Sequence, residues 1–410
     1  MFAFDVDIAI IGGGIGGLWL LNRLRSRGYN AVLFEHEALG SQQSVNSQGM
    51  IHGGIKYALS GALTGSSEAI ADMPAHWRRC LQGEGDVDLR GANILSDHFY
   101  LWSSDTIASR LTSFFASKMT RGRVDSVGAD ERHPIFQNPA FRGNVYRLVD
   151  LVLDVPSVLS KLAANARGSI FHVDKESLTF DRDARGKVTA LIANCGADSI
   201  RCNAQAFVFS AGAGNAALLG EIGCKKPEMQ RRPLHQALVK HAYPHALYAH
   251  CTGANPSPRL TISSHRLRDG QWVWYLGGDL ATEGVELSEG QLIDAARNEL
   301  CDLFPWVNFG PTALDDKAQW ATLRIDRAEP KQKGLVKPDK AFASFADHHR
   351  NIIVAWPTKL TLAPNMADEV EALLNSEAAS LFDTKAPPLP AACADLPAPR
   401  IAKPCWELAF

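Results

Sequence analysis

The clearest hydrophobic pattern of the chain lies at its N-terminus. Residues 6–11, VDIAII, form a short run of apolar and β-branched residues, which predicts a buried strand. Residues 18–24 then place apolar side chains at helical spacing, in a segment that ends near Gly28. Residues 31–34, AVLF, predict a second strand. The start of the chain is therefore expected to fold as a strand, a helix and a second strand.

A glycine-rich turn joins the first strand to the helix. Gly12, Gly14 and Gly17 have the spacing G-x-G-x-x-G, which permits a tight turn, a close approach of pyrophosphate and close packing of the helix on the strand. The helix N-terminus adds N–H donors and a partial positive charge. Glu35 closes the second strand, where its carboxylate can accept hydrogen bonds from an adenosine ribose. These residues predict a dinucleotide site. The motif does not separate NAD from FAD, and a turn that only packs is the alternative.

The later pattern alternates between helix and strand. Apolar and turn positions predict strands at residues 145–152 and 206–214, the second of which ends in small residues, a hairpin at 187–193 and 199–202, and an extended stretch at 170–173. They also predict helices at 155–166 and 365–374. Residues 93–102 and 247–280 have a different texture, because they are rich in strand-forming and aromatic residues. Two kinds of domain are therefore expected.

A polar loop follows the second strand, where a nicotinamide-binding fold would continue with a further helix and strand. Residues 41–54 are SQQSVNSQGMIHGG. With this loop the chain resembles the D-amino-acid-oxidase-like superfamily of FAD-dependent oxidoreductases. Residues 46–57, NSQGMIHGGIKY, lie between the H-G-G-L-R-Y stretch of FAD-dependent glycerol-3-phosphate dehydrogenases and the N-S-G-x-I-H-S-G-I-x-Y stretch of L-2-hydroxyglutarate dehydrogenases. The resemblance implies FAD as the cofactor.

The resemblance also implies contacts for this loop. Ser44, Asn46 and Ser47 would lie against the pyrophosphate and the flavin, and Lys56 and Tyr57 would reach the substrate. The glycerol-phosphate enzymes carry Arg where this chain has Lys56. Lysine lacks the planar fork that binds phosphate through two hydrogen bonds.

Three later segments would complete the cofactor site. By resemblance, the backbone of Val173 holds the adenine, and Gly212 allows a close approach of the diphosphate. Lys359, Leu360 and Thr361 look like the core of a G-G-K-x-T-T loop, in which the lysine touches substrate and the threonine touches flavin. The helix that follows can stabilise negative charge on a reduced flavin. A surface or capping lysine is the alternative for Lys359.

Candidate substrate residues come from the same resemblance. Residues 319–324, QWATLR, are similar to a W-A-G-x-R element whose arginine faces the acid or phosphate of the substrate. His235 lies where glycerol-phosphate enzymes carry a histidine that can accept a hydroxyl proton, and His52 is a second candidate. The alternative for Arg324 is a solvated run of salt bridges with its charged neighbours.

These features predict an α/β fold with a Rossmann-like FAD-binding domain built from discontinuous segments and an inserted antiparallel-sheet substrate domain of α+β type. The predicted boundaries are 1–80, 145–230 and 331–383 for the FAD-binding domain, 81–144 and 231–330 for the substrate domain, and 384–410 for a proline-rich C-terminal tail.

Composition narrows the function classes. Lys and Arg number 42 and Asp and Glu number 44, so a net charge of -2 argues against a nucleic-acid partner. None of the eight cysteines forms a C-x-x-C pair or a Cys/His zinc spacing, so we predict reduced thiols, no metal site and a cytoplasmic protein. The longest early apolar run, residues 8–21, is too short to span a bilayer. Peripheral contact with a membrane stays open.

Taken together, the sequence predicts an FAD-dependent oxidoreductase. A small anionic substrate, either a hydroxy acid or a glycerol-phosphate-like molecule, would lose hydride from a C–H beside OH or NH to flavin N5. The electron acceptor would be O₂ or a quinone or other carrier. The alternatives are an amino-acid or amine oxidase of the same fold that uses O₂, a nicotinamide dehydrogenase, and a flavin-binding protein without turnover.

Overall fold

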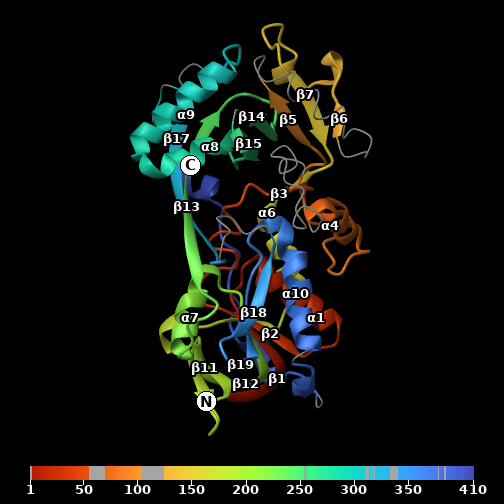
Figure 1. Cartoon of the computed structure of the whole chain (residues 1–410), viewed down its shortest axis with the longest axis vertical. Coiled ribbons are helices and arrows are strands. Elements are labelled where there is room, and N and C mark those ends of the chain that lie inside the picture. The colour runs from red at the N-terminus through yellow and green to blue at the C-terminus, as the bar shows by residue number, and fades with distance from the viewer. Residues whose placement is uncertain are drawn as a thin grey trace.

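Two large sheets dominate the fold and lie one above the other along the long axis of the molecule (Figure 1). The computed structural model describes residues 2–54, 70–103, 124–253, 255, 257–309, 314, 316, 319–332, 340–376, 378–382 and 385–410. Two long paired strands, β13 (Met229–His241) and β17 (Trp320–Pro330), run from the second sheet toward the first. The predicted mixed α/β fold class is confirmed.

The first sheet has eight strands around a parallel centre. Its parallel strands, in order along the sheet, are β9 (Ile170–His172), β2 (Ala31–Glu35), β1 (Phe2–Ile11), β12 (Asp198–Phe209) and β19 (His349–Trp356). Antiparallel strands complete it, namely β10 (Thr179–Arg182), β11 (Val188–Cys195) and β18 (Phe342–Ala346). Since the five parallel strands end at one edge, the loops that follow them meet there.

Helices cover these sheets. The described α-helices are α1 (Ile15–Ser26), α4 (Met73–Gln82), α6 (Val155–Asn165), α7 (Asn215–Glu221), α8 (Asp279–Glu283), α9 (Glu289–Leu303), α10 (Ala363–Asn375) and α11 (Cys405–Ala409). The 3-10 turns used below are η6 (Gly212–Gly214), η7 (Gly284–Glu286), η9 (Leu360–Leu362) and η11 (Ala391–Asp395). Within the described ranges, no helix has both the length and the apolar character needed to cross a membrane.

Strand β1 shows why the N-terminal sequence folds as it does. Its residues from Val6 to Ile11 are all buried, because both faces of the sheet are covered. Ile8 and Ile10 pack into a core shared with helices α1, α6 and α10. Ala9 and Ile11 pack into a second core, which the antiparallel strands and the C-terminal tail help to close. The predicted strand, helix and strand are confirmed.

The second sheet is almost entirely antiparallel. Beyond β17 and β13 its order is β16 (Trp272–Gly277), β15 (Pro258–Arg266), β14 (Ala249–Thr252), β5 (Phe99–Ser103), β7 (Asn144–Leu148) and β6 (Val124–Ser126), and only β14 and β5 pair in parallel. Ala237 and Val239 on one face of β13 pack in a core with helix α9. Leu238 on the other face packs with Tyr275 and with Trp406 of helix α11. A third sheet of β3 (Met50–Ile51), β8 (Leu151–Leu153) and β4 (Ile94–Ser96) lies between the two halves.

Two elements depart from the prediction. Residues 145–152 form two strands, β7 and β8, because the chain bends between Leu148 and Leu151. Strand β7 pairs with β5 in the second sheet, although the sequence places it in the FAD-binding segment. The strands expected at 199–202 and 206–214 are one strand, β12, which ends at Phe209. It pairs with β11 along its first half and with β19 at its end. The domain boundaries themselves stay a prediction.

Two buried histidines of the second sheet, His241 and His265, have lowered pKa values. Burial lowers the pKa of His241 and of His265 to about 3. The His265 ring stacks on Trp406, with ring centroids 3.5 Å apart, and its Nε2 lies 3.0 Å from Ser263 Oγ. Both imidazoles are therefore neutral in the folded protein.

We expect His265→Phe to weaken the pH dependence of the free energy of unfolding. An unfolded histidine has a pKa near about 6.5, so below that pH the unfolded chain binds a proton that the folded chain excludes. Stability is therefore full above pH ~6.5 and falls as the pH drops, by about 2 kcal/mol per such histidine between pH 7.5 and pH 5. Urea unfolding of flavin-free protein at these two pH values measures the difference, with exposed His348→Phe as the control. Equal losses in wild type and His265→Phe would contradict it.

Candidate functional site

The residues that the sequence assigns to the cofactor meet at the carboxyl edge of the first sheet. Gly12 follows β1, Glu35 ends β2, Val173 follows β9, Gly212 begins a turn after β12, and Lys359 follows β19. The Val173 N–H donates to the carbonyl of Glu35 at 2.9 Å. This edge of an open parallel sheet is where such folds bind their ligands.

Glycine suits each of the three motif positions for a different physical reason. Gly12 has φ +114°, in the region that favours glycine, and a Cβ there would lie 2.5 Å from Ala211 Cα. A Cβ on Gly17 would overlap the carbonyl oxygen of Gly12. Gly14 has ordinary extended backbone, φ -73° and ψ 179°, and its Cβ would meet only Ser44 Oγ, at 3.3 Å. The fold therefore needs Gly12 and Gly17, while Gly14 leaves space at the N-terminus of α1 that suits a pyrophosphate.

Glu35 is held as an ionised acceptor beside that turn. Its Oε2 accepts the Gly13 N–H at 2.6 Å, and its Oε1 accepts the N–H groups of His36 and Glu37 at 2.8 and 2.9 Å. Burial alone would raise the pKa of Glu35, but hydrogen bonds from His36, Glu37 and Gly13 outweigh it and lower the pKa below its usual value. Because a carboxylate oxygen can accept two hydrogen bonds, Oε2 retains capacity for a ribose hydroxyl.

The loop between β2 and β3 faces the same turn. Ser44 Oγ accepts the first N–H of helix α1 at 2.9 Å. The Ser47 hydroxyl is buried and has no hydrogen-bond partner among the described residues. Asn46 instead supports the loop, because its Oδ1 accepts the Cys405 N–H at 3.2 Å and its carbonyl accepts the Tyr275 hydroxyl at 3.0 Å. Ser44 and Ser47 therefore lie where a cofactor contact is predicted, and Asn46 holds them there.

The loop after β19 closes the site from the other side. Thr361 Oγ1 donates to the carbonyl of Met50 at 3.2 Å and accepts the N–H of His52 at 3.3 Å. Lys359 is extended, and Leu360 after it begins η9, which leads directly into helix α10. The predicted helix N-terminus is therefore present beside His52 and the start of the third sheet. Two predicted residues, Lys56 and Tyr57, lie outside the described residues.

The second sheet meets this edge through Gln48, Gln236 and Tyr275. Gln48 Nε2 donates to the carbonyl of Tyr275 at 2.8 Å. The Tyr275 hydroxyl oxygen lies 2.8 Å from Gln236 Oε1. Gly277 lies next to both glutamine side chains, since a Cβ on it would lie 2.8 Å from Gln48 Oε1 and 3.5 Å from Gln236 Nε2. The face of β13 that carries Gln236 is therefore the one that faces the cofactor edge.

His235 and Arg324 lie on the opposite face. They are paired across β13 and β17, and adjacent residues of a strand point to opposite sides. His235 Nδ1 lies 3.0 Å from the carbonyl of Gly284, and Arg324 donates to the carbonyls of Val285 and Leu287 at 3.1 and 2.9 Å. These carbonyls belong to the segment around η7 on the α9 side. The geometry of both side chains therefore gives no support to the catalytic roles predicted for them.

Arg327 lies on the cofactor-facing side, although the sequence did not single it out. It stands three positions after Arg324, so the strand pleat turns it to the face of Gln236. Arg327 is half-buried, and its Nε donates to the carbonyl of Arg232 at 3.4 Å. Arg232 itself forms two 3.0 Å hydrogen bonds with buried Glu329, which neutralises its charge inside the protein. The alternation of side chains along a strand could have placed Arg327 on this face, but only if the pairing of β17 with β13 were already known.

His250 is a second residue that the sequence did not single out. It lies on β14, opposite Thr261 of β15, in the row that continues to Gly277 and Gln236. Its Nδ1 lies 2.8 Å from Thr261 Oγ1, its ring packs against Phe99, and it is 2 % exposed. A buried imidazole therefore lies on the same sheet face as Gln236.

A hydrogen-bonded cluster under α1 offers metal-ligand atoms but is organised differently. His76 Nε2 and Cys80 Sγ lie 2.7 and 3.2 Å from Asp86 Oδ1, while Trp19 and Arg23 donate to its Oδ2 at 3.0 and 3.1 Å. Burial would raise the pKa of Asp86, but these hydrogen bonds lower it well below its usual range. Burial and the Asp86 charge raise the pKa of the Cys80 thiol to about 12. A protonated thiol and an adjacent guanidinium favour a structural hub over a metal centre.

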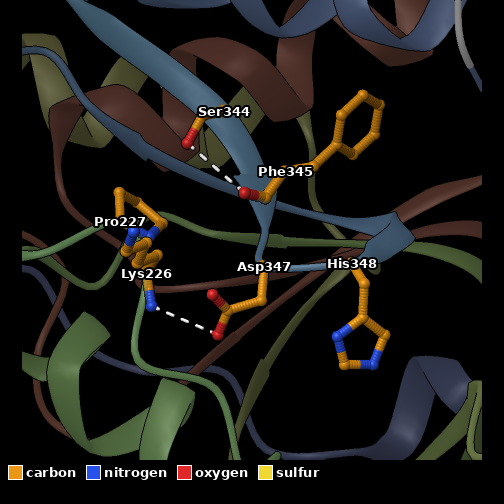
Figure 2. Close-up of a pocket in the computed structure, with 6 residues that line it drawn as sticks. All are labelled: Lys226, Pro227, Ser344, Phe345, Asp347 and His348. Carbon is orange, nitrogen blue, oxygen red and sulfur yellow. Dashed lines mark hydrogen bonds between the residues drawn. The ribbon is translucent and has the colours of Figure 1, made fainter.

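A surface pocket lies away from the candidate site (Figure 2). Asp347 and His348 form the turn before β19, at the edge opposite the glycine-rich turn. The Asp347 carboxylate accepts the N–H groups of Lys225 and Lys226 at 2.7 and 3.3 Å. The pocket therefore belongs to the amino edge of the sheet. Its lining residues are Lys226, Pro227, Ser344, Phe345, Asp347 and His348.

The fold and the site have the features of a protein that binds a dinucleotide at the carboxyl edge of a parallel sheet. Residues 7–372 match the family described as FAD dependent oxidoreductase. The chain belongs to this family and is an FAD-dependent oxidoreductase. It is 50% identical over 410 residues to a probable FAD-dependent oxidoreductase of Pseudomonas aeruginosa, covering 100% of this chain and 99% of the relative.

The chain is also similar in fold to solved structures of oxidoreductases. The crystal structure of the FAD dependent oxidoreductase from Pseudomonas aeruginosa superposes with a TM-score of 0.84 at 44% identity, covering 100% of this chain and 99% of the other. A glycine oxidase from Bacillus cereus has a TM-score of 0.62 at 15% identity, with 90% and 95% covered. L-alpha-glycerophosphate oxidase from Mycoplasma pneumoniae with FAD bound has a TM-score of 0.60 at 12% identity, with 95% and 98% covered. The last two likenesses concern the fold alone.

The described residues fit FAD. Gly14 leaves open space at a helix N-terminus, Glu35 retains an acceptor site, and the buried Ser47 hydroxyl lacks a protein partner among the described residues. The predicted cofactor, FAD, is confirmed by the family, while the roles of individual residues stay predictions.

Proposed function

We propose that the protein oxidises a small amino acid or a related amine that carries one carboxylate. The observation that carries this proposal is the placement of Arg327 on the cofactor-facing side of the second sheet, on the same face as Gln236. A guanidinium binds a carboxylate through two parallel hydrogen bonds, and burial strengthens that contact. The amide of Gln48 approaches the same face through Tyr275.

Charge favours a carboxylate over a phosphate. On this face Arg232 is neutralised by Glu329, and Arg327 is the arginine of the β13–β17 pair that we propose to meet the substrate. A monoanion matches one guanidinium better than a phosphate dianion, which proteins usually meet with several positive charges or N–H donors. A carboxylate is therefore the preferred anion, in place of the glycerol-phosphate-like substrate that the sequence resemblance suggests.

Proton chemistry favours an amine over a hydroxyl. Once the ammonium proton has passed to water, an amine can lose hydride from its carbon while the nitrogen lone pair takes up the positive charge. An alcohol must lose its O–H proton to a base as the hydride leaves. The base predicted for that step, His235, faces the carbonyl of Gly284 on the other side of the sheet. One protein of similar fold is named as a glycine oxidase, and glycine is an amino acid. This fold-level analogy supports the preference for an amine.

In this proposal FAD supplies the hydride acceptor, and the protein supplies binding and orientation. Arg327 holds the carboxylate, which fixes the distance of the neighbouring C–H from the cofactor edge. Gln236 and Gln48 offer neutral amide groups to the amine without adding charge. The N-terminus of the η9–α10 segment places N–H groups and a partial positive charge beside Thr361.

A hydroxy acid is the second candidate substrate, and His250 favours it. Its imidazole shares a sheet face with Gln236 and could take a hydroxyl proton if Thr261 released it. His52 offers another imidazole beside Thr361. In this case flavin reduction would rise with pH through a histidine-like ionisation.

An anaerobic flavin-bleaching screen tests the proposal. Purified holoprotein is mixed with amino acids, N-substituted amino acids, hydroxy acids and glycerol phosphates, and the loss of oxidised-flavin absorbance is followed. We expect bleaching by members of the first two groups. Bleaching by hydroxy acids alone would select the second candidate, and bleaching by glycerol phosphates alone would overturn the charge argument. Readmitting air then shows whether O₂ or another carrier accepts the electrons.

A further inference from the structure

The C-terminal tail runs from the amino side of the first sheet, beside Asp7 and the start of β2, to the cofactor edge and on to the second sheet. It leaves the first sheet where the Ala386 N–H donates to Asp7 Oδ1 at 2.7 Å, and it ends beside the second sheet in helix α11 (Figure 1). On the way, η11 places buried Cys393 in the core under the first sheet. The proline-rich composition therefore accompanies a path that is fixed by contacts at several points.

The first contact point lies at the ribose end of the site. The His172 N–H donates to the carbonyl of Pro397 at 2.7 Å. His172 is the residue of β9 that pairs with Glu35 of β2. The tail is thus one strand away from the carboxylate that is placed to accept the ribose.

The second contact point lies behind the glycine-rich turn. Leu39 donates its N–H to the carbonyl of Arg400 at 2.7 Å, and its carbonyl accepts the N–H of Ala402 at 3.0 Å. The Leu39 side chain fills the space beside Gly13, where a Cβ would lie 2.5 Å from Leu39 Cδ2. The Gly40 N–H donates to the carbonyl of Gly13 at 2.9 Å. The tail therefore holds the segment that supports the pyrophosphate turn.

The third contact point lies at the flavin end. The Cys405 N–H donates to Asn46 Oδ1 at 3.2 Å, and the carbonyl of Asn46 accepts the Tyr275 hydroxyl at 3.0 Å. Trp406 is 5 % exposed and stacks on His265 of β15 with an interplanar angle of 12°. Loop, tail and second sheet are joined here through one residue, Asn46, which is two positions from Ser44 and next to Ser47.

We infer that the tail, residues 385–410, is a clamp for FAD: it positions the loop from Leu39 to Gln48 over the dinucleotide, and Trp406 locks it to the second sheet. None of the described contacts requires the tail to touch FAD itself, so Trp406 and Cys405 are positioning residues that act through Asn46. Because linkage is reciprocal, bound FAD must also stabilise the attachment of the tail. Release of FAD then requires the loop to move, which the tail opposes.

The test compares rates of FAD release from holoprotein variants, followed by flavin fluorescence after dilution. We expect Trp406→Ala to release FAD at least about tenfold faster than wild type, and Trp406→Phe to restore a slow rate because it retains a stacking ring. Two controls separate clamping from general destabilisation. Leu408→Ala alters the exposed side of the same helix, and Leu300→Ala removes buried bulk from the α9 core on the far face of the second sheet. A wild-type rate in Trp406→Ala, or equal acceleration in Leu300→Ala, would overturn the inference.

Hydrogen exchange on unmodified protein gives a second, independent measurement. The amides of Leu39, Ala402 and Cys405 should exchange at least about tenfold more slowly with FAD bound than in flavin-free protein. The amide of Leu300 in α9 should change much less. Equal protection of the three tail-linked amides in both forms would show that the tail and the cofactor site are uncoupled, and would also overturn the inference.

Discussion

Gly14→Val is expected to give a folded protein that has lost its FAD. Gly14 already has an extended backbone that valine adopts readily, and its Cβ direction meets only Ser44 Oγ, at 3.3 Å. The added side chain would instead fill the space at the N-terminus of α1 that the pyrophosphate needs. Losing two or more hydrogen bonds to a charged group, at about 1.5–3 kcal/mol each, weakens FAD binding by about 10²- to 10⁴-fold. Flavin absorbance per chain and titration of flavin-free protein with FAD measure the loss.

Valine substitutions at two other glycines serve as comparisons for Gly14→Val. Gly128 has similar backbone angles, φ -61° and ψ 155°, and nothing lies within 4 Å of its Cβ direction, so Gly128→Val should keep both fold and FAD. Gly17→Val should fail differently, because its Cβ overlaps the carbonyl of Gly12 and so disrupts the packing of α1 on β1. Full flavin content in folded Gly14→Val would contradict the assignment of the pyrophosphate to this turn.

The cofactor side of the molecule was largely predictable because its signals are local. A short apolar run, a glycine spacing and an acid at the end of the next strand each reflect the conformation of neighbouring residues. The parallel strands then bring the site residues to one edge of the sheet. Each site residue ends or follows such a strand, namely Gly12, Glu35, Val173, Gly212 and Lys359. Residues that are far apart in the sequence therefore meet in the fold, because the carboxyl ends of parallel strands lie at one edge of the sheet.

The substrate side was less predictable because it depends on register and on contacts between distant segments. Both faces of β13 are covered, one by α9 and the other by the loop and tail, so its sequence lacks the alternation that would reveal which face meets the cofactor. The motif therefore pointed to His235 and Arg324, which the pleat turns away. The stack of Trp406 on His265 joins residues 141 positions apart and leaves no local pattern.

Arg327→Met is expected to lower kcat/KM for a carboxylate substrate by about 30- to 4,000-fold while leaving FAD bound. Loss of one partner of a desolvated, hydrogen-bonded charge pair costs about 2–5 kcal/mol, and each 1.4 kcal/mol is about a factor of ten. Methionine keeps much of the apolar stem, so packing of the β13–β17 pair changes little. Anaerobic stopped-flow reduction of the flavin by the best substrate of the bleaching screen measures the effect. Flavin content per chain is checked in the same samples.

Arg324→Met is the matched control, because Arg324 lies on the same strand but donates to the carbonyls of Val285 and Leu287 on the far face. It should lower kcat/KM by less than about threefold. The amide of the same substrate gives a second comparison, since it keeps the reacting carbon and removes the negative charge. For this neutral compound, Arg327→Met and wild type should differ little, because the guanidinium then has no anion to bind. If Arg324→Met lost activity toward the carboxylate and Arg327→Met kept it, the sequence motif would be right about the anchor. The register of β13 and β17 would then place the substrate on the α9 side of the sheet.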